Sequence, residues 1–303
     1  MRRDEVDRSK LSPMMNHYME IKDKYPDTII FYRLGDFYEM FFEDAVQVSH
    51  ELELTLTGRN AGLTERVPMC GVPYHAYQGY VDKLIDRGYK VAICEQLTDP
   101  KDSKGMVERD VVQVVTKGTI LDNLLNEKDN NYLASVYNFG YSYAISYADI
   151  STGDVYTLIV NDTNSLEREL INKGIKEIIV NDTIEREIIY LLKENYHILV
   201  TITNDLCDKE EYQYIYSDLS DIRMKTSVMH LLSYIVDTKK TSLVHLKKCV
   251  LLNQNEYLLF DIHTKKNLEL TETIRDSNRI YSLLWLLDKT KTAMGSRFLK
   301  QNI

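Results

Sequence analysis

The first 120 positions alternate between apolar spacings typical of helices and of strands. Ser12 and Pro13 predict the start of a helix, with Ser12 as the N-cap and proline at the first helical position. Apolar residues then recur at helical spacing as far as Pro26. The β-branched and aromatic run TIIFYR (28–33) is typical of a strand. A second helical stripe follows, consisting of Phe41, Ala45, Val48 and Leu52. Together with a helix over 77–87 and strands over 91–96 and 111–116, this pattern predicts a compact mixed α/β domain over 1–120.

A polar stretch without periodicity, LDNLLNEKDNN (121–131), indicates a domain boundary. After it, two alternating runs meet at a turn (152–154), and helices then alternate with strands from 165 to 202. Such alternation implies a parallel sheet with crossover helices. We therefore predict a second α/β domain over 128–222.

The pattern becomes mainly helical from position 223. The first helix of this segment has an apolar face, which consists of Val228, Leu231, Leu232 and Ile235. An extended, hairpin-like region (249–262) and helices over 282–303 follow. The last helix is amphipathic and stops at Ile303 without a glycine cap or a polar tail, so we expect the chain to be a piece of a longer protein. We predict a truncated helical segment over 223–303.

Charge is distributed unevenly along the chain. The whole sequence of 303 residues is 44% hydrophobic, 27% charged and carries a formal net charge of −9, which is ordinary for a globular protein. Residues 121–221 hold about 7 basic and 19 acidic side chains, whereas residues 222–303 hold about 14 and 7. A nucleic-acid surface is therefore expected at the two ends of the chain and not at its centre. Without a signal peptide or the roughly 18 apolar residues of a membrane span, we expect a cytoplasmic protein.

Sequence motifs for catalysis are missing. None of the twelve glycines is followed by lysine, so the G-x-x-x-x-G-K phosphate loop is absent. The sequence contains neither G-x-S-x-G nor H-E-x-x-H, and its four cysteines form no C-x-x-C pair. We expect no enzyme activity, no cofactor and no metal in this chain.

Several segments, in order and spacing, resemble the MutS family of DNA mismatch-recognition proteins. They are FYRLGDFYEMFFEDA (31–45), VPMCGVPYHA (67–76), VAICEQLTDP (91–100), KGMVERDVVQVVTKGT (104–119), TKKTSLVHL (238–246), KKNLELTETIR (265–275) and SLLWLLDKTKTAMGSRFLKQNI (282–303). The resemblance covers essentially the whole chain and is weakest across 121–222. It implies a multidomain α/β protein with a mismatch-recognition domain (1–120), an RNase H-like connector domain (128–222) and the start of a helical core and lever region (223–303).

The resemblance also implies partners and cofactors. Full-length members of the family bind mismatched double-stranded DNA as homodimers, bind ATP and Mg²⁺ at a C-terminal ATPase, and pass the signal to a MutL-type protein. We expect the DNA, MutL-type and self partners here, in a bacterial cytoplasm and associated with the nucleoid. The ATPase and its cofactors belong to a part of the family that this chain lacks.

Two residues, Phe37 and Glu39, match the family's Phe-x-Glu element, which enters the minor groove. An aromatic wedge stabilises a kinked duplex, and the kink costs less where pairing is already defective. Spacing alone favours another interpretation, because Asp36-x-x-Glu39 fits a capping box and Phe37 falls on the apolar face that continues at Phe41 and Ala45. The resemblance favours the DNA-binding interpretation.

Phosphate contacts are expected from basic residues in the family-like loops, namely Arg33, Arg59, Arg66, Lys104 and Arg109. Surface salt bridges are the equal alternative for each of them.

Two other functions stay open: a nuclease built on Asp149 with Asp154 and Asp182, and an interaction module that binds no DNA. For Asp149 a turn-capping role is favoured, since nothing in the spacing brings the three acids together.

Overall fold

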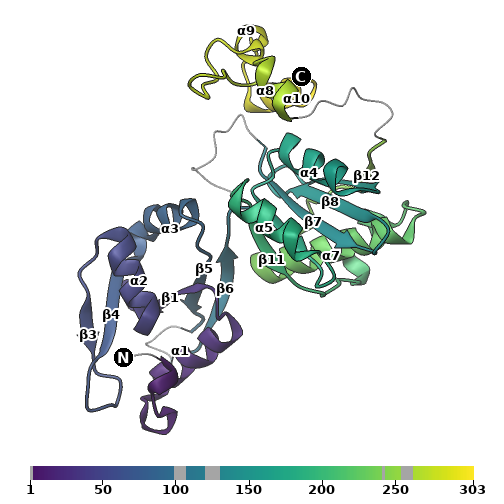
Figure 1. Ribbon diagram of the computed structural model, residues 1–303. Coiled ribbons are helices and arrows are strands. Elements are labelled where there is room, and N and C mark those ends of the chain that lie inside the picture. The colour runs from purple at the N-terminus through teal and green to yellow at the C-terminus, as the bar shows by residue number, and fades with distance from the viewer. Residues whose placement is uncertain (1–2, 99–106, 120–129, 241–242, 254–261) are drawn as a thin grey trace. The chain divides into compact units, whose positions relative to one another are not determined.

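The computed structural model describes residues 3–98, 107–119, 130–240, 243–253 and 262–303 (Figure 1). The chain divides into two compact units. The first consists of Met1–Lys117 with Asp237–Thr241, and the second of Gly118–Val236 with Ser242–Ile303. Both contain a mixed sheet with helices, which confirms the predicted multidomain α/β class.

The first unit is built on a six-stranded sheet in the order β3-β4-β2-β1-β5-β6. Its strands are β1 (Ile29–Leu34), β2 (Phe37–Phe41), β3 (Thr57–Arg59), β4 (Val67–Pro73), β5 (Val91–Gln96) and β6 (Arg109–Val115). Its main helices are α1 (Pro13–Lys24), α2 (Phe42–Leu52) and α3 (Tyr77–Asp86). Strand β1 pairs parallel with β5, and the other neighbours are antiparallel.

Helix α1 begins where the sequence predicts, because the Ser12 hydroxyl accepts from the Met15 amide and Pro13 occupies the first turn. Its apolar residues pack on one face of the sheet, in one cluster with Tyr32 and Phe41. Side chains alternate along a strand, so their neighbours point to the opposite face. There Tyr38 contacts Tyr77 of α3, and α2 and α3 pack on β4.

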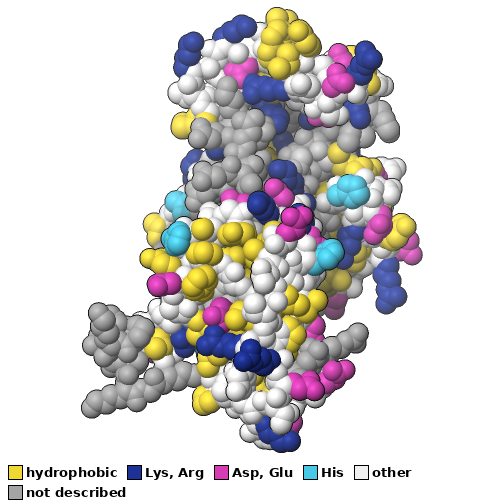
Figure 2. Space-filling view, turned by 90° about the vertical axis from the view of Figure 1, so that its left-hand side faces the viewer, with side chains coloured by type: hydrophobic (Ala, Val, Ile, Leu, Met, Phe, Trp, Pro, Cys, Tyr) yellow, Lys and Arg dark blue, Asp and Glu magenta, His cyan; other side chains and the backbone are white. Residues whose placement is uncertain are grey.

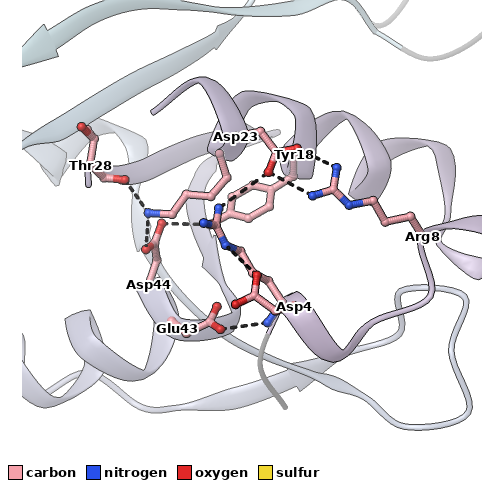
Figure 3. A network of polar contacts seen from close by, with 9 residues as sticks. Asp4, Arg8, Tyr18, Asp23, Thr28, Glu43 and Asp44 are labelled. Atoms are coloured by element: carbon pink, nitrogen blue, oxygen red, sulfur yellow. Dashed lines mark hydrogen bonds and ion pairs between the residues drawn. The ribbon is translucent and has the colours of Figure 1, made fainter. Parts of the chain in front are cut away.

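A buried ion pair joins α1 to α2 (Figure 3). Lys22 Nζ lies 2.7 Å from Asp44 Oδ1 and also donates to the carbonyl of Thr28 at 2.7 Å. The other oxygen of Asp44 accepts from the Ile30 amide and from the Tyr18 hydroxyl, both at 3.1 Å. Burial, followed by the charge of Asp44, raises the pKa of Tyr18 well above its usual value. The network therefore ties both helices to the end of β1.

The second unit has a six-stranded sheet in the order β11-β10-β7-β8-β9-β12. Its strands are β7 (Tyr132–Asn138), β8 (Tyr143–Asp149), β9 (Asp154–Val160), β10 (Glu177–Val180), β11 (Leu199–Ile202) and β12 (Val250–Leu251). Strands β7, β8 and β9 form an antiparallel meander, and β10 and β11 join it in parallel. This order fits the RNase H-like topology that the resemblance implies. Helices α4 (Thr163–Asn172) and α5 (Arg186–Glu194) pack on one face.

Helix α7 (Ile222–Lys239) runs across the position of the boundary that the sequence predicts at 223. Its residues Val228 and Leu231 are buried in one cluster with Leu133 and Val155 of the second sheet, on the face opposite α4 and α5. The helix as far as Val236 therefore belongs to the second compact unit. Its apolar stripe predicted burial correctly, but a stripe does not specify which surface it packs against.

The remaining α-helices of the described residues are short. They are a small helix α6 (Gln213–Tyr216), α8 (Ile262–Asn267), α9 (Leu283–Leu287) and α10 (Ala293–Gln301). Only Val250–Leu251 of the expected extended region 249–262 is a strand among the residues described there, and 254–261 lie outside them. Among the described residues no helix is long and apolar enough to cross a membrane.

Candidate nucleic-acid interface

Phe37 is presented by a tight hairpin between β1 and β2. Leu34 pairs with Phe37, which leaves Gly35 and Asp36 as a two-residue loop. Gly35 has a φ of +58°, a left-handed conformation that favours glycine. The loop therefore ends the first strand abruptly and starts β2 with Phe37, whose side chain is 48% exposed.

The strand conformation overturns the helical interpretation of this segment. Phe37–Phe41 forms β2, and α2 begins only at Phe42, so Asp36 and Glu39 do not form a capping box. The residues at 37 and 41 share a face because they are an even number apart in a strand, and not because of a helical period. Phe41 on that face is fully buried against α1, whereas Phe37 is not part of this core cluster.

Glu39 lies between these two phenylalanines on the same face of β2. Its carboxylate forms an ion pair with Arg59 of β3, and its side chain is 15% exposed. In the sheet β4 separates the two strands, and the β4 residue opposite Glu39 is Gly71. A Cβ atom added at Gly71 would lie 3.5 Å from Cγ of Glu39, so any larger side chain there would stand beside the acid.

Arg33 and Arg109 both contact protein groups of the first unit around the β1–β2 hairpin, and their role as phosphate contacts stays a prediction. The Arg33 guanidinium lies 3.8 Å from the ring centre of Tyr74 and donates to the carbonyl of Gly35. Arg109 is 8% exposed and donates to the carbonyls of Arg33 and Val107, both at 2.9 Å. Both arginines therefore support the β1–β2 hairpin from within.

The other two described arginines are placed differently. Arg59 is held by Glu39, with its side chain 35% exposed. Arg66 is exposed near the end of the β3–β4 hairpin, and no salt bridge to it is found within the described part of the chain. Arg66 is thus available to solvent, and its contact with phosphate stays a prediction. Lys104 lies outside the described residues.

Sequence reasoning missed the aromatic support beneath the hairpin. Tyr74 stacks on Arg33, and its amide donates to the carbonyl of Asp36 at 2.9 Å. On the covered face, Tyr38 donates its hydroxyl to Glu95. Burial, with this hydrogen bond to a carboxylate, raises the pKa of Tyr38 above its usual range. In the sequence, the segment 73–77 is recognisable only by its two tyrosines, and their presence does not predict that Tyr74 contacts the turn at 35–36.

The three acids of the nuclease alternative, Asp149, Asp154 and Asp182, do not form a metal-binding site in the described residues. Asp149 is fully buried, and its carboxylate accepts from the Ser151 amide at 2.9 Å, the Ser151 hydroxyl at 2.6 Å and the Asn130 side chain at 2.9 Å. Asp154 is paired with Lys247 at 2.8 Å. Across the described residues no group of three or more acidic, histidine or cysteine side chains could hold a metal ion. Asp149 caps a turn, and Asp182 lies on a different loop.

The described basic side chains form no single field on the face shown in Figure 2. Lysine and arginine side chains lie among acidic and apolar ones there.

Fold and site together define a class: an α/β protein whose first unit presents an exposed aromatic residue and a paired acid on one sheet face. Comparison with known families specifies it further. The family models for MutS domain I, MutS domain II and MutS domain III match residues 12–124, 131–247 and 263–303. The second match includes helix α7, in agreement with its packing on the second sheet.

Similar proteins carry the same family name. The chain is 46% identical over 292 residues to the DNA mismatch repair protein MutS of Geobacillus sp. (strain WCH70), covering 96% of this chain and 34% of that protein. It is 45% identical over 296 residues to the protein of the same name from Oceanobacillus iheyensis, covering 97% and 34%. The chain belongs to the MutS family. It spans about a third of the length of these relatives.

Proposed function

We propose that this chain recognises mismatched or unpaired bases in duplex DNA, with Phe37 inserted from the minor groove and Glu39 contacting a base edge. The observation that carries the proposal is the contrast on one strand face between Phe37, 48% exposed, and Phe41, 0% exposed. An aromatic side chain that a fold leaves exposed at the tip of a supported hairpin is available to stack on a base.

Selectivity follows from the energy of deforming the duplex. Inserting a side chain between base pairs costs a few kcal/mol of unstacking, and the cost is smaller where pairing is already defective. The wedge must hold its position for this difference to appear as a difference in affinity. The two-residue loop, the Arg33–Tyr74 stack and the Tyr38–Glu95 hydrogen bond supply that rigidity.

The remaining parts of the proposal follow from the family. We propose that the whole protein acts as a homodimer on mismatched DNA, passes the signal to a MutL-type partner, and works at the nucleoid in a bacterial cytoplasm. Because no glycine in the sequence is followed by lysine, we propose that ATP and Mg²⁺ act at a part of the protein other than this chain.

A binding measurement tests the proposal. The affinity for a duplex with one mismatch and for its fully paired counterpart is measured for the wild type and for Phe37→Ala. We expect the wild type to prefer the mismatch and Phe37→Ala to bind both duplexes alike. Retention of the preference by Phe37→Ala would contradict the wedge. A chain that binds no duplex would favour the interaction-module alternative.

A further inference from the structure

The ion pair between Glu39 and Arg59 connects the base-contacting acid to a residue two strands away. Arg59 belongs to the edge strand β3, and Glu39 to β2 on the other side of β4. The Glu39 side chain is 15% exposed and that of Arg59 is 35% exposed, so the guanidinium lies on the more open side. Gly71 contributes no side chain on β4 next to the acid.

Charge explains why such a pair matters at a DNA-facing surface. The duplex carries one negative charge for about every 1.7 Å of helix axis, so an unpaired carboxylate entering a groove is repelled by phosphates on both sides. A guanidinium bound to that carboxylate cancels its charge and also restricts its orientation, because arginine and carboxylate pair in a fixed planar geometry.

We propose that Arg59 is a positioning residue: it holds the carboxylate of Glu39 in place and neutralises its charge on the DNA-facing surface. This inference rests on the function proposed above. Arg59 acts through Glu39, and its contribution to mismatch binding therefore depends on the presence of the acid. A direct phosphate contact, the role expected from the sequence, would contribute whether or not Glu39 is present.

A double-mutant cycle separates the two roles. Arg59→Gln, Glu39→Gln and the double variant are prepared in the full chain, and their affinities for mismatched and paired duplexes are compared. With Glu39 present, Arg59→Gln leaves an uncompensated carboxylate, and we expect about tenfold weaker binding of the mismatched duplex. In the Glu39→Gln background the same substitution should change binding less than about twofold, since no charge is left to neutralise.

Arg66→Gln is the matched control. Arg66 lies on the same β3–β4 hairpin, is exposed, and is not paired with Glu39. As a phosphate contact it should weaken binding equally in both backgrounds and lower the salt slope by about one. Arg59→Lys keeps the charge but not the planar guanidinium, so it should restore only part of the affinity that Arg59→Gln loses. Thermal unfolding without DNA should show that every variant keeps its fold, because glutamine has nearly the volume of glutamate and the two arginines are at least partly exposed.

Equal losses from Arg59→Gln in the wild-type and Glu39→Gln backgrounds would overturn the inference and assign Arg59 to the phosphates. Such a result would leave the proposed function intact as long as the wild type prefers mismatches and Phe37→Ala does not. A wild type without mismatch preference would overturn the proposed function, and with it the inference.

Discussion

Phe37 and Phe41 lie four residues apart on one face of β2, yet the structure gives them opposite environments. We expect Phe37→Ala to change the free energy of unfolding by no more than about 0.5 kcal/mol, as is usual for exposed positions. Phe41→Ala removes a fully buried ring from the α1 core and should cost about 3–5 kcal/mol. Urea unfolding of the two variants measures the contrast. Equal destabilisation would place Phe37 in the core and contradict its role as a wedge.

The buried ion pair between Lys22 and Asp44 joins two residues that are 22 positions apart in the sequence. Lys22→Ala would leave the charge of Asp44 in a site where only 5% of its side chain is exposed. Removing one partner of a buried pair typically costs about 3–5 kcal/mol, so the midpoint of urea unfolding should fall markedly. Lys24→Ala, on the exposed side of α1, is the control and should leave the midpoint unchanged. A small effect of Lys22→Ala would show that the Asp44 carboxylate is satisfied by Tyr18 and Ile30 alone.

Among the elements, α7 is joined to the second sheet through a buried histidine. His230 Nδ1 lies 2.8 Å from the Ser135 hydroxyl, and Nε2 lies 2.8 Å from the carbonyl of Thr203. The carbonyl can only accept, so Nε2 carries the proton of the neutral ring and Ser135 donates to Nδ1. Burial lowers the pKa of His230 below its ordinary value of 6.5.

This lowered pKa predicts how stability depends on pH. The unfolded histidine takes up a proton near its ordinary pKa, while the folded one stays neutral to lower pH. The contribution of His230 to the free energy of unfolding should therefore be constant above about pH 7 and decrease as the pH falls below about 6.5. His230→Gln should be less stable at every pH but should lose less on going from pH 7.5 to pH 5.5, as measured by urea unfolding. An identical loss in both proteins would show that His230 does not contribute to the pH dependence.

For the whole molecule, the net charge of −9 predicts that DNA binding depends on a few local contacts. Each phosphate neutralised adds about 0.9 to the slope of the logarithm of affinity against the logarithm of salt concentration. We expect a measurable negative slope. Arg66→Gln should reduce its magnitude by about one, because the Arg66 side chain is exposed. Salt titrations of duplex binding measure it, and a flat dependence would remove the electrostatic part of the proposal.

Nucleotide binding is a separate prediction for the whole chain. Titration calorimetry with Mg-ATP should give no heat of binding, because the sequence lacks the glycine-lysine loop that surrounds a triphosphate. The titration is performed on the same preparation that binds DNA, so that a folded chain is certain. A saturable signal would reveal a nucleotide site of another type.

Local sequence was sufficient where neighbouring residues decide the structure. The start of α1 at Ser12 and Pro13 and the apolar stripe of α7 follow from capping and from periodicity, which are local properties. The two α/β domains followed from the alternation of elements, and the family resemblance pointed to Phe37 and Glu39 from short motifs.

Only the tertiary structure decided which residues from distant parts of the sequence contact one another. Phe37 fits both a helical core stripe and an exposed strand start, and only the pairing of β2 with β1 and β4 selects the strand. Arg33, Arg59 and Arg109 looked alike in sequence as phosphate contacts. Their partners Tyr74, Glu39 and the carbonyl of Arg33 lie 41, 20 and 76 positions away, so only the fold shows which group each arginine contacts. A side chain's type and spacing are local, whereas its partner is set by the sheet that brings remote strands together.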